Sequence, residues 1–340
     1  MRRLILIAGA IALGLALAAC QPPPPSAQAV AEAARDRQAQ LAFATGQQAW
    51  RDERKADLTR PEGWTSLVGL HWLEPGAHYL GSDPDNGIRL AMGPAHLGMI
   101  ELKRGGLRFV PENDVALTLD GVTLAGVVSL QADDDPAGPS KLAFDDGRGV
   151  ATVIKRDERY ALRVRHADAP SRTGFHGIDY WPAAAGWRVP GRFIPHPPGR
   201  TLAIANIIGT TDDVPNPGAI EFERGGKTYR LEALDEGDGG LFLVFADRTN
   251  GHGSYGAGRF LDAAQPDAQG RVMLDFNRAY NPPCAFTPFA TCPLPPAENR
   301  LDLLIDAGEK SYHQRTSKAR TPKVRTPKAR TPTPAEPTQG

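Results

Sequence analysis

Hydrophobic and polar residues alternate over short stretches in much of this chain, a pattern that predicts β-strands. Around positions 100–110 and 117–124 the alternation continues on both sides of a Gly-Gly and an Asp-Gly pair, and residues 219–222 and 228–231 flank a further Gly-Gly pair. Such pairs accept the positive φ angles of tight turns, so three hairpins are predicted. Residues 240–246 (GLFLVFA) are apolar throughout, which indicates a strand buried on both faces.

One long stretch has a helical composition instead. Residues 29–62 are rich in Ala, Gln, Arg, Glu and Asp, and their larger apolar groups lie between Leu41 and Trp50. They predict a helix with an interruption near Gly46 and an end before Pro61. We expect one face of this helix to pack on the body of the protein, with partner binding as the alternative.

Turn-forming residues divide the rest of the body into two units. Glycine and proline supply 36 and 31 of the 340 residues, which is typical of a β-rich protein with many turns. Residues 63–168 predict a β-sandwich, and residues 169–312 predict a second β-rich sandwich or barrel. The expected fold is therefore mainly β, with an N-terminal helix followed by two β units.

The first unit contains a run of residues similar to a known sandwich domain. Residues 81–90 (GSDPDNGIRL), followed by His96 and Asp120-Gly121, resemble the opening of a forkhead-associated (FHA) domain, which binds phosphothreonine. That family has an arginine directly after its first glycine, where this chain has Ser82. The resemblance implies an FHA-like sandwich, but it argues against phosphopeptide binding because the charge-assisted clamp for a phosphate is missing.

The beginning of the chain predicts export and lipidation. Residues 1–19 combine two arginines with a short apolar run, as a secretory signal peptide does. The run ends in Leu-Ala-Ala-Cys at 17–20, which resembles the lipobox of bacterial lipoproteins, where cleavage leaves Cys20 as the lipid-modified first residue. The four prolines within residues 20–28 then predict an extended spacer.

An acylated Cys20 predicts where the protein is located. Each buried methylene contributes about 0.8 kcal/mol and such lipoproteins carry more than one chain, so the lipid bilayer is the expected first partner. Gln21, in place of Asp, is the residue that implies sorting to the outer membrane rather than retention at the inner one. We expect a cell-envelope protein that faces the periplasm.

The other end of the chain is basic. Residues 313–340 contain three near-copies of a five-residue unit, TSKAR, TPKVR and TPKAR. The 39 basic and 39 acidic residues of the whole chain balance, so a basic tail implies an acidic body. A tail of this composition should be disordered. It either binds an anionic envelope surface or is a solvated extension, and nucleic acid is not an expected partner of an exported protein.

Candidate chemistry concentrates in residues 271–300, which hold six prolines and two cysteines. In an oxidising periplasm Cys284 and Cys292 are expected to form a disulfide. No histidine pattern accompanies them, so neither a metal nor a cofactor is predicted. Alternation along the predicted strand would put Asp275 and Asn277 on one face.

Two interpretations of this stretch remain open. It is either a rigid plug whose polar groups bond to the backbone, or a preorganised wall that faces a small polar ligand. For the second interpretation the candidate ligand-binding residues are His176, Asp179, Asp247, Arg259, Asp275, Asn277, Tyr280, Asn281 and Glu298.

Three long strings carry a second family resemblance: GFHGIDYWP (174–182), FADRTNGHGSYGAGRFL (245–261) and LDFNRAYNPPCAFTPFATCPLPPAENRL (274–301). They resemble a bacterial family known as domain of unknown function 1684. The resemblance extends over residues 64–312 and implies an exported, often lipidated, β-rich protein. It implies no activity, cofactor or catalytic residue.

Three functions from different classes fit these observations. The first is a membrane-anchored envelope lipoprotein that binds a small polar ligand or an envelope partner. The second is a hydrolase of envelope material that uses Asp275 with Glu298, or His176 with Asp179, as acid and base. The third is a structural envelope-assembly factor, in which such polar groups would be buried and bonded to each other.

Overall fold

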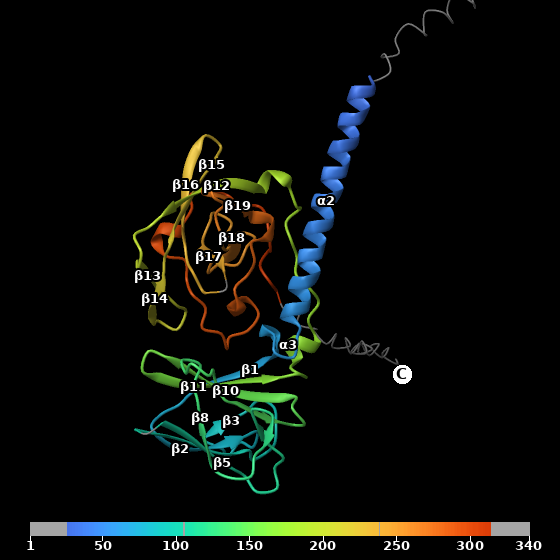
Figure 1. Cartoon of the computed structure of the whole chain (residues 1–340). Coiled ribbons are helices and arrows are strands. Elements are labelled where there is room, and N and C mark those ends of the chain that lie inside the picture. The colour runs from blue at the N-terminus through green and yellow to red at the C-terminus, as the bar shows by residue number, and fades with distance from the viewer. Residues whose placement is uncertain (1–25, 105, 238, 314–340) are drawn as a thin grey trace, which may run out of the picture.

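The computed structural model describes residues 26–104, 106–237 and 239–313 (Figure 1). The described chain is mainly β, with an N-terminal helix and several sheets, as the sequence predicts. The expected signal peptide, the lipidated Cys20, the four prolines of the spacer and the basic repeats of the tail all lie outside the described residues.

Helix α2 (Ala27–Leu58) is one continuous element of 32 residues. The Ser26 hydroxyl caps its first turn by accepting a hydrogen bond from the Ala29 N–H at 3.2 Å. The interruption expected near Gly46 is therefore wrong. One glycine costs a helix only about 1 kcal/mol relative to alanine, and the good helix formers on both sides outweigh that cost. No helix within the described ranges is both long and apolar enough to cross a membrane.

The two halves of α2 have different surroundings. Positions 27–42 are exposed on all sides and extend beyond the body (Figure 1). In the second half, buried or half-buried positions recur every three or four residues: Phe43, Gln47, Trp50, Arg54 and Leu58. That spacing places them on one helix face, which packs on the second β unit.

The first β unit is a sandwich of two sheets. One sheet has the order β1 (Leu67–Trp72), β11 (Arg159–His166), β10 (Gly149–Arg156), β9 (Lys141–Phe144), β6 (Thr118–Leu119), β7 (Val122–Thr123). The other has the order β3 (Ile88–Arg89), β2 (Gly76–Gly81), β4 (Gly98–Lys103), β5 (Gly106–Pro111), β8 (Val128–Leu130). Their inner faces share one core, which includes Leu80, Phe109, Phe144 and Val164. The predicted sandwich is present, and the resemblance to FHA domains stays a prediction.

The second β unit contains three sheets. Four strands follow the order β16 (Lys227–Ala233), β15 (Gly218–Arg224), β12 (Arg188–Pro195), β19 (Arg271–Asp275). Two further pairs are β13 (Thr201–Ala205) with β14 (Thr211–Pro215) and β17 (Gly240–Phe245) with β18 (Arg259–Ala264). Because none of these described sheets closes on itself, the unit is not a closed barrel.

Short helical turns connect and flank these strands. They are η2 (Trp64–Ser66), α3 (Pro170–Thr173), η3 (Ala185–Trp187), η4 (Phe276–Arg278), η5 (Pro283–Ala285) and η6 (Ala297–Asn299). Of these, η2 precedes β1, and α3 lies on the connection between the two units.

The predicted hairpins are confirmed. Strands β4 and β5, β6 and β7, and β15 and β16 form antiparallel pairs. At the Asp120-Gly121 turn the φ angles are 51° and 83°, the left-handed values that the pair was expected to supply. Strand β17 is buried from Leu241 to Phe245, as its continuous apolar run indicates.

The predicted strand from Leu274 to Asn281 is only partly correct. Strand β19 ends at Asp275, and η4 follows directly. The Asp275 carboxylate accepts a hydrogen bond from the Asn277 N–H and so caps this turn in place of a continuing strand. The expected alternation is lost as a result, and both Phe276 and Asn277 are fully buried.

Candidate functional site

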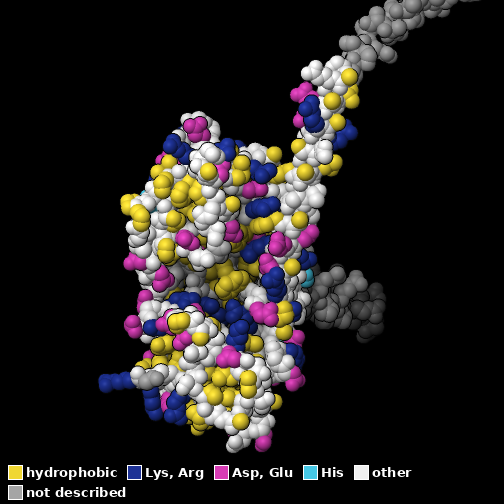
Figure 2. Space-filling view, in the orientation of Figure 1, with side chains coloured by type: hydrophobic (Ala, Val, Ile, Leu, Met, Phe, Trp, Pro, Cys, Tyr) yellow, Lys and Arg dark blue, Asp and Glu magenta, His cyan; other side chains and the backbone are white. Residues whose placement is uncertain are grey.

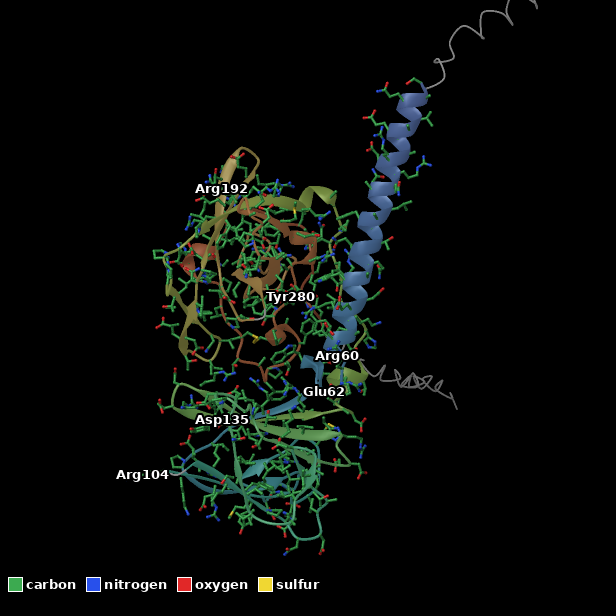
Figure 3. The ribbon with its side chains drawn as sticks, in the orientation of Figure 1. Arg60, Glu62, Arg104, Asp135, Arg192 and Tyr280 are labelled. Atoms are coloured by element: carbon green, nitrogen blue, oxygen red, sulfur yellow. A yellow bond between two sulfur atoms is a disulfide. The ribbon has the colours of Figure 1, made fainter. Side chains whose placement is uncertain are left out.

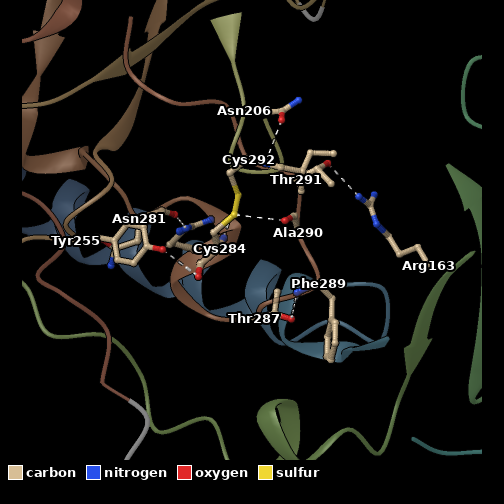
Figure 4. The surroundings of a disulfide bond; sticks show 12 residues. Arg163, Asn206, Tyr255, Asn281, Cys284, Thr287, Phe289, Ala290, Thr291 and Cys292 are labelled. Atoms are coloured by element: carbon tan, nitrogen blue, oxygen red, sulfur yellow. Dashed lines mark hydrogen bonds between the residues drawn. A yellow bond between two sulfur atoms is a disulfide. The ribbon is translucent and has the colours of Figure 1, made fainter. Parts of the chain in front are cut away.

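The predicted disulfide between Cys284 and Cys292 is present, with the two Cα atoms 6.2 Å apart (Figure 4). It closes a loop that lies at the boundary between the two β units. Within this loop the Thr291 hydroxyl accepts a hydrogen bond from Arg163 of β11 at 3.4 Å. The loop of the second unit therefore contacts the outer face of the six-stranded sheet of the first.

Arg163 and Arg165 lie on that outer face because of the alternation in β11. Leu162 and Val164 point into the sandwich core, so the residues between and after them point the other way. Across the ladder Arg163 stands opposite Thr152, and Arg165 stands opposite Val150. Arg163 is only 7% exposed although it carries a full charge.

The two guanidinium groups have few partners. Among the described residues neither has a carboxylate within ion-pair distance, and the Nε atom of each is buried without a hydrogen-bond partner. Each guanidinium carbon lies 5.8 Å from the centre of the Trp64 ring, which packs beneath them. Leaving a buried charge unpaired costs up to several kcal/mol, so these arginines are unusual.

The pKa values show the same lack of partners. Burial, together with repulsion from Arg156 and Arg165, lowers the pKa of Arg163 to about 10, and Asp133 only partly opposes this. Burial also lowers the pKa of Arg165, against the attraction of Glu62. An anion beside these groups would reverse both shifts.

A pocket of about 460 Å³ opens beside Arg165. Its side chains come from the six-stranded sheet and from the segment that follows α2. Apolar and hydroxyl groups line part of it, namely Pro61, Thr118, Ala143, Val150 and Thr152. Its charged groups are Glu62, Asp120, Lys141, Arg148 and Arg165. In Figure 2, Lys and Arg side chains gather along the boundary between the units, and Figure 3 shows Glu62 at the same level.

A second cavity at this boundary is apolar. It measures about 350 Å³, and the disulfide loop supplies Phe286, Thr287, Pro288 and Phe289. The first unit supplies Leu67, Val68, Ala91 and Met92. This cavity is lined by both units, whereas the pocket beside Arg165 is lined by the first unit and the segment after α2.

Most residues that the sequence suggested as ligand-binding lie elsewhere. Arg259 is completely buried and donates to the Asp247 carboxylate at 2.7 Å. It also donates to the backbone carbonyls of Ile305, at 2.9 Å, and Ala307. This pair therefore holds the last described segment of the chain against the second core.

Asp275 and Asn277 also make hydrogen bonds that hold other segments in place. Asp275 accepts a hydrogen bond from Gln47 of α2 at 2.9 Å. The Asn277 side chain pairs with both backbone polar groups of Ala184, at 2.9 Å each. The first contact fixes the helix, and the second fixes the segment before η3.

Tyr280 and Asn281 belong to the docking surface of α2. The Arg54 guanidinium lies 4.5 Å from the centre of the Tyr280 ring and donates to the Asn281 carbonyl at 2.9 Å. It also pairs with Glu309 at 3.0 Å. Burial raises the pKa of the Glu309 carboxyl, with Arg54 and the Asn281 N–H opposing the shift. Burial beside Asp262 raises the pKa of Tyr280 as well.

Only His176 and Asp179, of the nine candidates, line a described pocket together. That pocket measures about 280 Å³ and also includes Ser311, Tyr312 and His313. Glu298 is exposed in η6, and no described pocket brings it together with Asp275. Within the described residues, no three His, Cys, Asp or Glu side chains group as metal ligands would.

Sequence reasoning missed Arg163 and Arg165. The signal was present in residues 161–165 (ALRVR), where two arginines alternate with apolar residues. Alternation predicts one charged face for such a strand, but it does not show that another unit covers that face.

The fold and the site together define a two-unit β protein with a docked N-terminal helix and a partly basic pocket between the first unit's six-stranded sheet and the segment after α2. Residues 173–310 match the family model described as protein of unknown function (DUF1684), which covers most of the second unit.

A solved structure also shows similarity to part of the chain. It is the solution NMR structure of an uncharacterized protein of Haloarcula marismortui, 29% identical over 41% of this chain and 78% of that one, with a TM-score of 0.34. At that TM-score the likeness carries no argument about fold or function. The search of curated proteins found no match.

Proposed function

We propose that this chain is a lipid-anchored envelope protein that binds a small polar ligand in the pocket between the six-stranded sheet and the segment after α2. The lipobox ending in Cys20 supports the anchor, and the exposed half of α2 would act as a stem between the anchor and the body. At 1.5 Å per residue, the sixteen exposed positions 27–42 add about 24 Å of reach.

The single observation that carries the ligand-binding function is the pocket beside Arg165. Its volume of about 460 Å³ is within the range of small-molecule sites. Its lining combines apolar surface with a few charged groups, the usual composition of a site that orients a ligand. The nine candidates from the sequence do not form a comparable arrangement.

The test is recovery of ligand from the full-length lipoprotein. The protein is purified from membranes in mild detergent and analysed by native mass spectrometry and by extraction of bound small molecules. We expect a bound compound that is lost in Ala143→Phe, which fills the pocket, and kept in Val122→Phe, at an exposed position of β7. Equal recovery from both variants would place binding elsewhere.

The basic tail is proposed to add contact with an anionic envelope surface. A chain that ends after Tyr312 is compared with the intact chain in co-sedimentation with vesicles that contain anionic lipid. Weaker sedimentation of the shortened chain is expected, and the difference should shrink at high salt because screening weakens surface attraction. Unchanged sedimentation would rule out this role.

Hydrolysis of envelope material is the second candidate, because His176 and Asp179 line one pocket with Ser311 and His313. A histidine and a carboxylate in one cavity can serve as base and acid. Loss of hydrolysis of purified envelope material in His176→Ala, with unchanged stability, would support it.

A further inference from the structure

We propose that the ligand of the pocket beside Arg165 is an acidic sugar, in which Arg165 binds a carboxylate or phosphate group and the neighbouring Arg163 adds positive charge. This inference rests on the proposed ligand-binding function and adds the chemical class of the ligand. It follows from three features of the pocket: its positive charges, its carboxylates that can accept hydrogen bonds from ligand hydroxyls, and its apolar surface.

The first step is the contrast between Arg163 and the other deeply placed arginines. Arg259 is just as buried, and it has the Asp247 carboxylate at 2.7 Å. Arg54 has Glu309 at 3.0 Å, and Arg156 has Asp133 at 2.9 Å. Arg163 has one long hydrogen bond to a hydroxyl and no ion pair among the described residues. Arg165, two residues further along β11, likewise has no ion pair among the described residues, and it is the one of the two that lines the pocket.

The second step is the spacing of the two arginines. Alternate residues on one strand face stand about 6.6 Å apart, at 3.3 Å per residue. Arg165 lines the pocket and can contact an oxyanion there, whereas Arg163 lines no described pocket and adds its positive charge from the neighbouring position. A planar guanidinium donates two parallel hydrogen bonds to a carboxylate or phosphate, so Arg suits this task better than Lys. Lys141, which also lines the pocket, adds further positive charge, whereas Arg148 is paired with Asp168 at 2.8 Å.

The third step is the rest of the pocket, which does not suit a bare inorganic anion. Glu62 and Asp120 also line it, and ionised carboxylates accept hydrogen bonds from hydroxyl groups. Pro61, Ala143 and Val150 offer apolar surface for the C–H face of a ring. An anionic group, several hydroxyls and an apolar face occur together in a sugar that carries a carboxylate or a phosphate.

The experiment is isothermal titration calorimetry on the full-length lipoprotein in detergent, after bound ligand has been removed by dialysis. The probes are galacturonate and glucose 1-phosphate, their neutral parents galactose and glucose, and inorganic phosphate. Binding of either acidic sugar at least about tenfold tighter than its neutral parent is expected, because charge-assisted hydrogen bonds are lost with the anion. The acidic probe that binds with the higher affinity then identifies either a carboxylate or a phosphate as the preferred group.

Substitutions of single arginines test which of them binds the anionic group of the sugar. Arg165→Gln should weaken binding of the acidic sugar about tenfold or more, and the matched exposed control Arg192→Gln, on β12, should leave it unchanged. Arg163→Met provides a second removal of charge with similar side-chain volume. Higher salt should weaken binding to the unmodified protein more than to Arg165→Gln.

The possible failures can be separated. If galactose binds as tightly as galacturonate and Ala143→Phe abolishes both, the ligand-binding function stands and the acidic class is overturned. If inorganic phosphate binds as tightly as the acidic sugars, the saccharide class is overturned. If no probe binds and no ligand is recovered from membranes, the proposed function fails together with this inference.

Discussion

Arg54 and Glu309 form an ion pair at 3.0 Å between the N-terminal helix and the last described segment of the chain. The Glu309 side chain is fully buried and that of Arg54 is 15% exposed. The same carboxylate accepts a hydrogen bond from the Asn281 N–H at 2.7 Å. The pair therefore joins three segments that are far apart in sequence, and it explains why the second half of α2 is docked while the first half is free.

Removing Arg54 should release the helix. Arg54→Met leaves the Glu309 carboxylate buried without its cation, so the free energy of unfolding at pH 7 should fall by about 3 kcal/mol. The loss should be smaller at pH 5, where Glu309 can bind a proton and avoid the unpaired charge. Urea unfolding at both pH values measures this effect. Lys55→Met, at an exposed neighbouring position, is the control, and an equal loss in both variants would contradict a specific role of the pair.

Gly46 offers a test of the continuous helix. A methyl group placed on it meets no atom within 4 Å, so Gly46→Ala should raise the free energy of unfolding by about 0.5 to 1 kcal/mol. The contrasting variant is Gly218→Ala, whose Cβ would lie 2.6 Å from the Ile194 carbonyl oxygen and close to the Phe193 ring. That variant should destabilise. A loss of stability in Gly46→Ala would show that the helix bends at this position in solution.

Local patterns in the sequence were sufficient for the hairpins and for the presence of the helix, but not for its continuity through Gly46. A hairpin depends on residues next to each other, so the pairs Asp120-Gly121 and Gly225-Gly226 predict their turns. The strand through Asn277 was predicted too long because alternation does not include a competing side chain, and the Asp275 carboxylate caps a turn there.

The candidate site could not be predicted from local patterns. Arg163 and Thr291 meet although they are 128 positions apart in the sequence, and no periodicity records such a contact. Arg259 was one of the candidates proposed to face a small polar ligand, and it follows a glycine-rich loop (residues 250–258). Its partner Asp247 lies before the same loop, and the loop brings both side chains together in the core. A polar residue beside a loop can therefore stabilise the fold instead of binding a ligand.

His71 should make stability depend on pH. Burial lowers the pKa of its ring below the ordinary 6.5, and its Nε2 atom is buried without a hydrogen-bond partner within the described residues. The unfolded chain therefore binds a proton more readily than the folded one. This contribution to stability is fully present above pH 6.5 and is lost as the pH falls from 6.5 toward the lower folded pKa.

The comparison of His71→Leu with the unmodified protein measures this contribution. Thermal unfolding at pH 8 and pH 5 should show a smaller drop in Tm for the variant, because it has no ring to protonate. His252→Leu, at an exposed position between β17 and β18, is the control. An identical drop in Tm for His71→Leu and the unmodified protein would show that His71 does not contribute to the pH dependence.

Arg163→Met separates a structural role of this arginine from a binding role. The only side-chain hydrogen bond that Arg163 makes among the described residues is the long one to Thr291, and its charge is buried without an ion pair. An apolar side chain of similar volume should therefore leave the ligand-free protein as stable as before, or raise the free energy of unfolding by about 1 kcal/mol. Arg259→Met leaves the buried Asp247 carboxylate without its cation, so the free energy of unfolding should fall by about 3 to 5 kcal/mol. Denaturant unfolding of both variants tests the contrast. If Arg163→Met destabilises as strongly as Arg259→Met, Arg163 supports the fold, and its charge is not retained for a ligand beside Arg165.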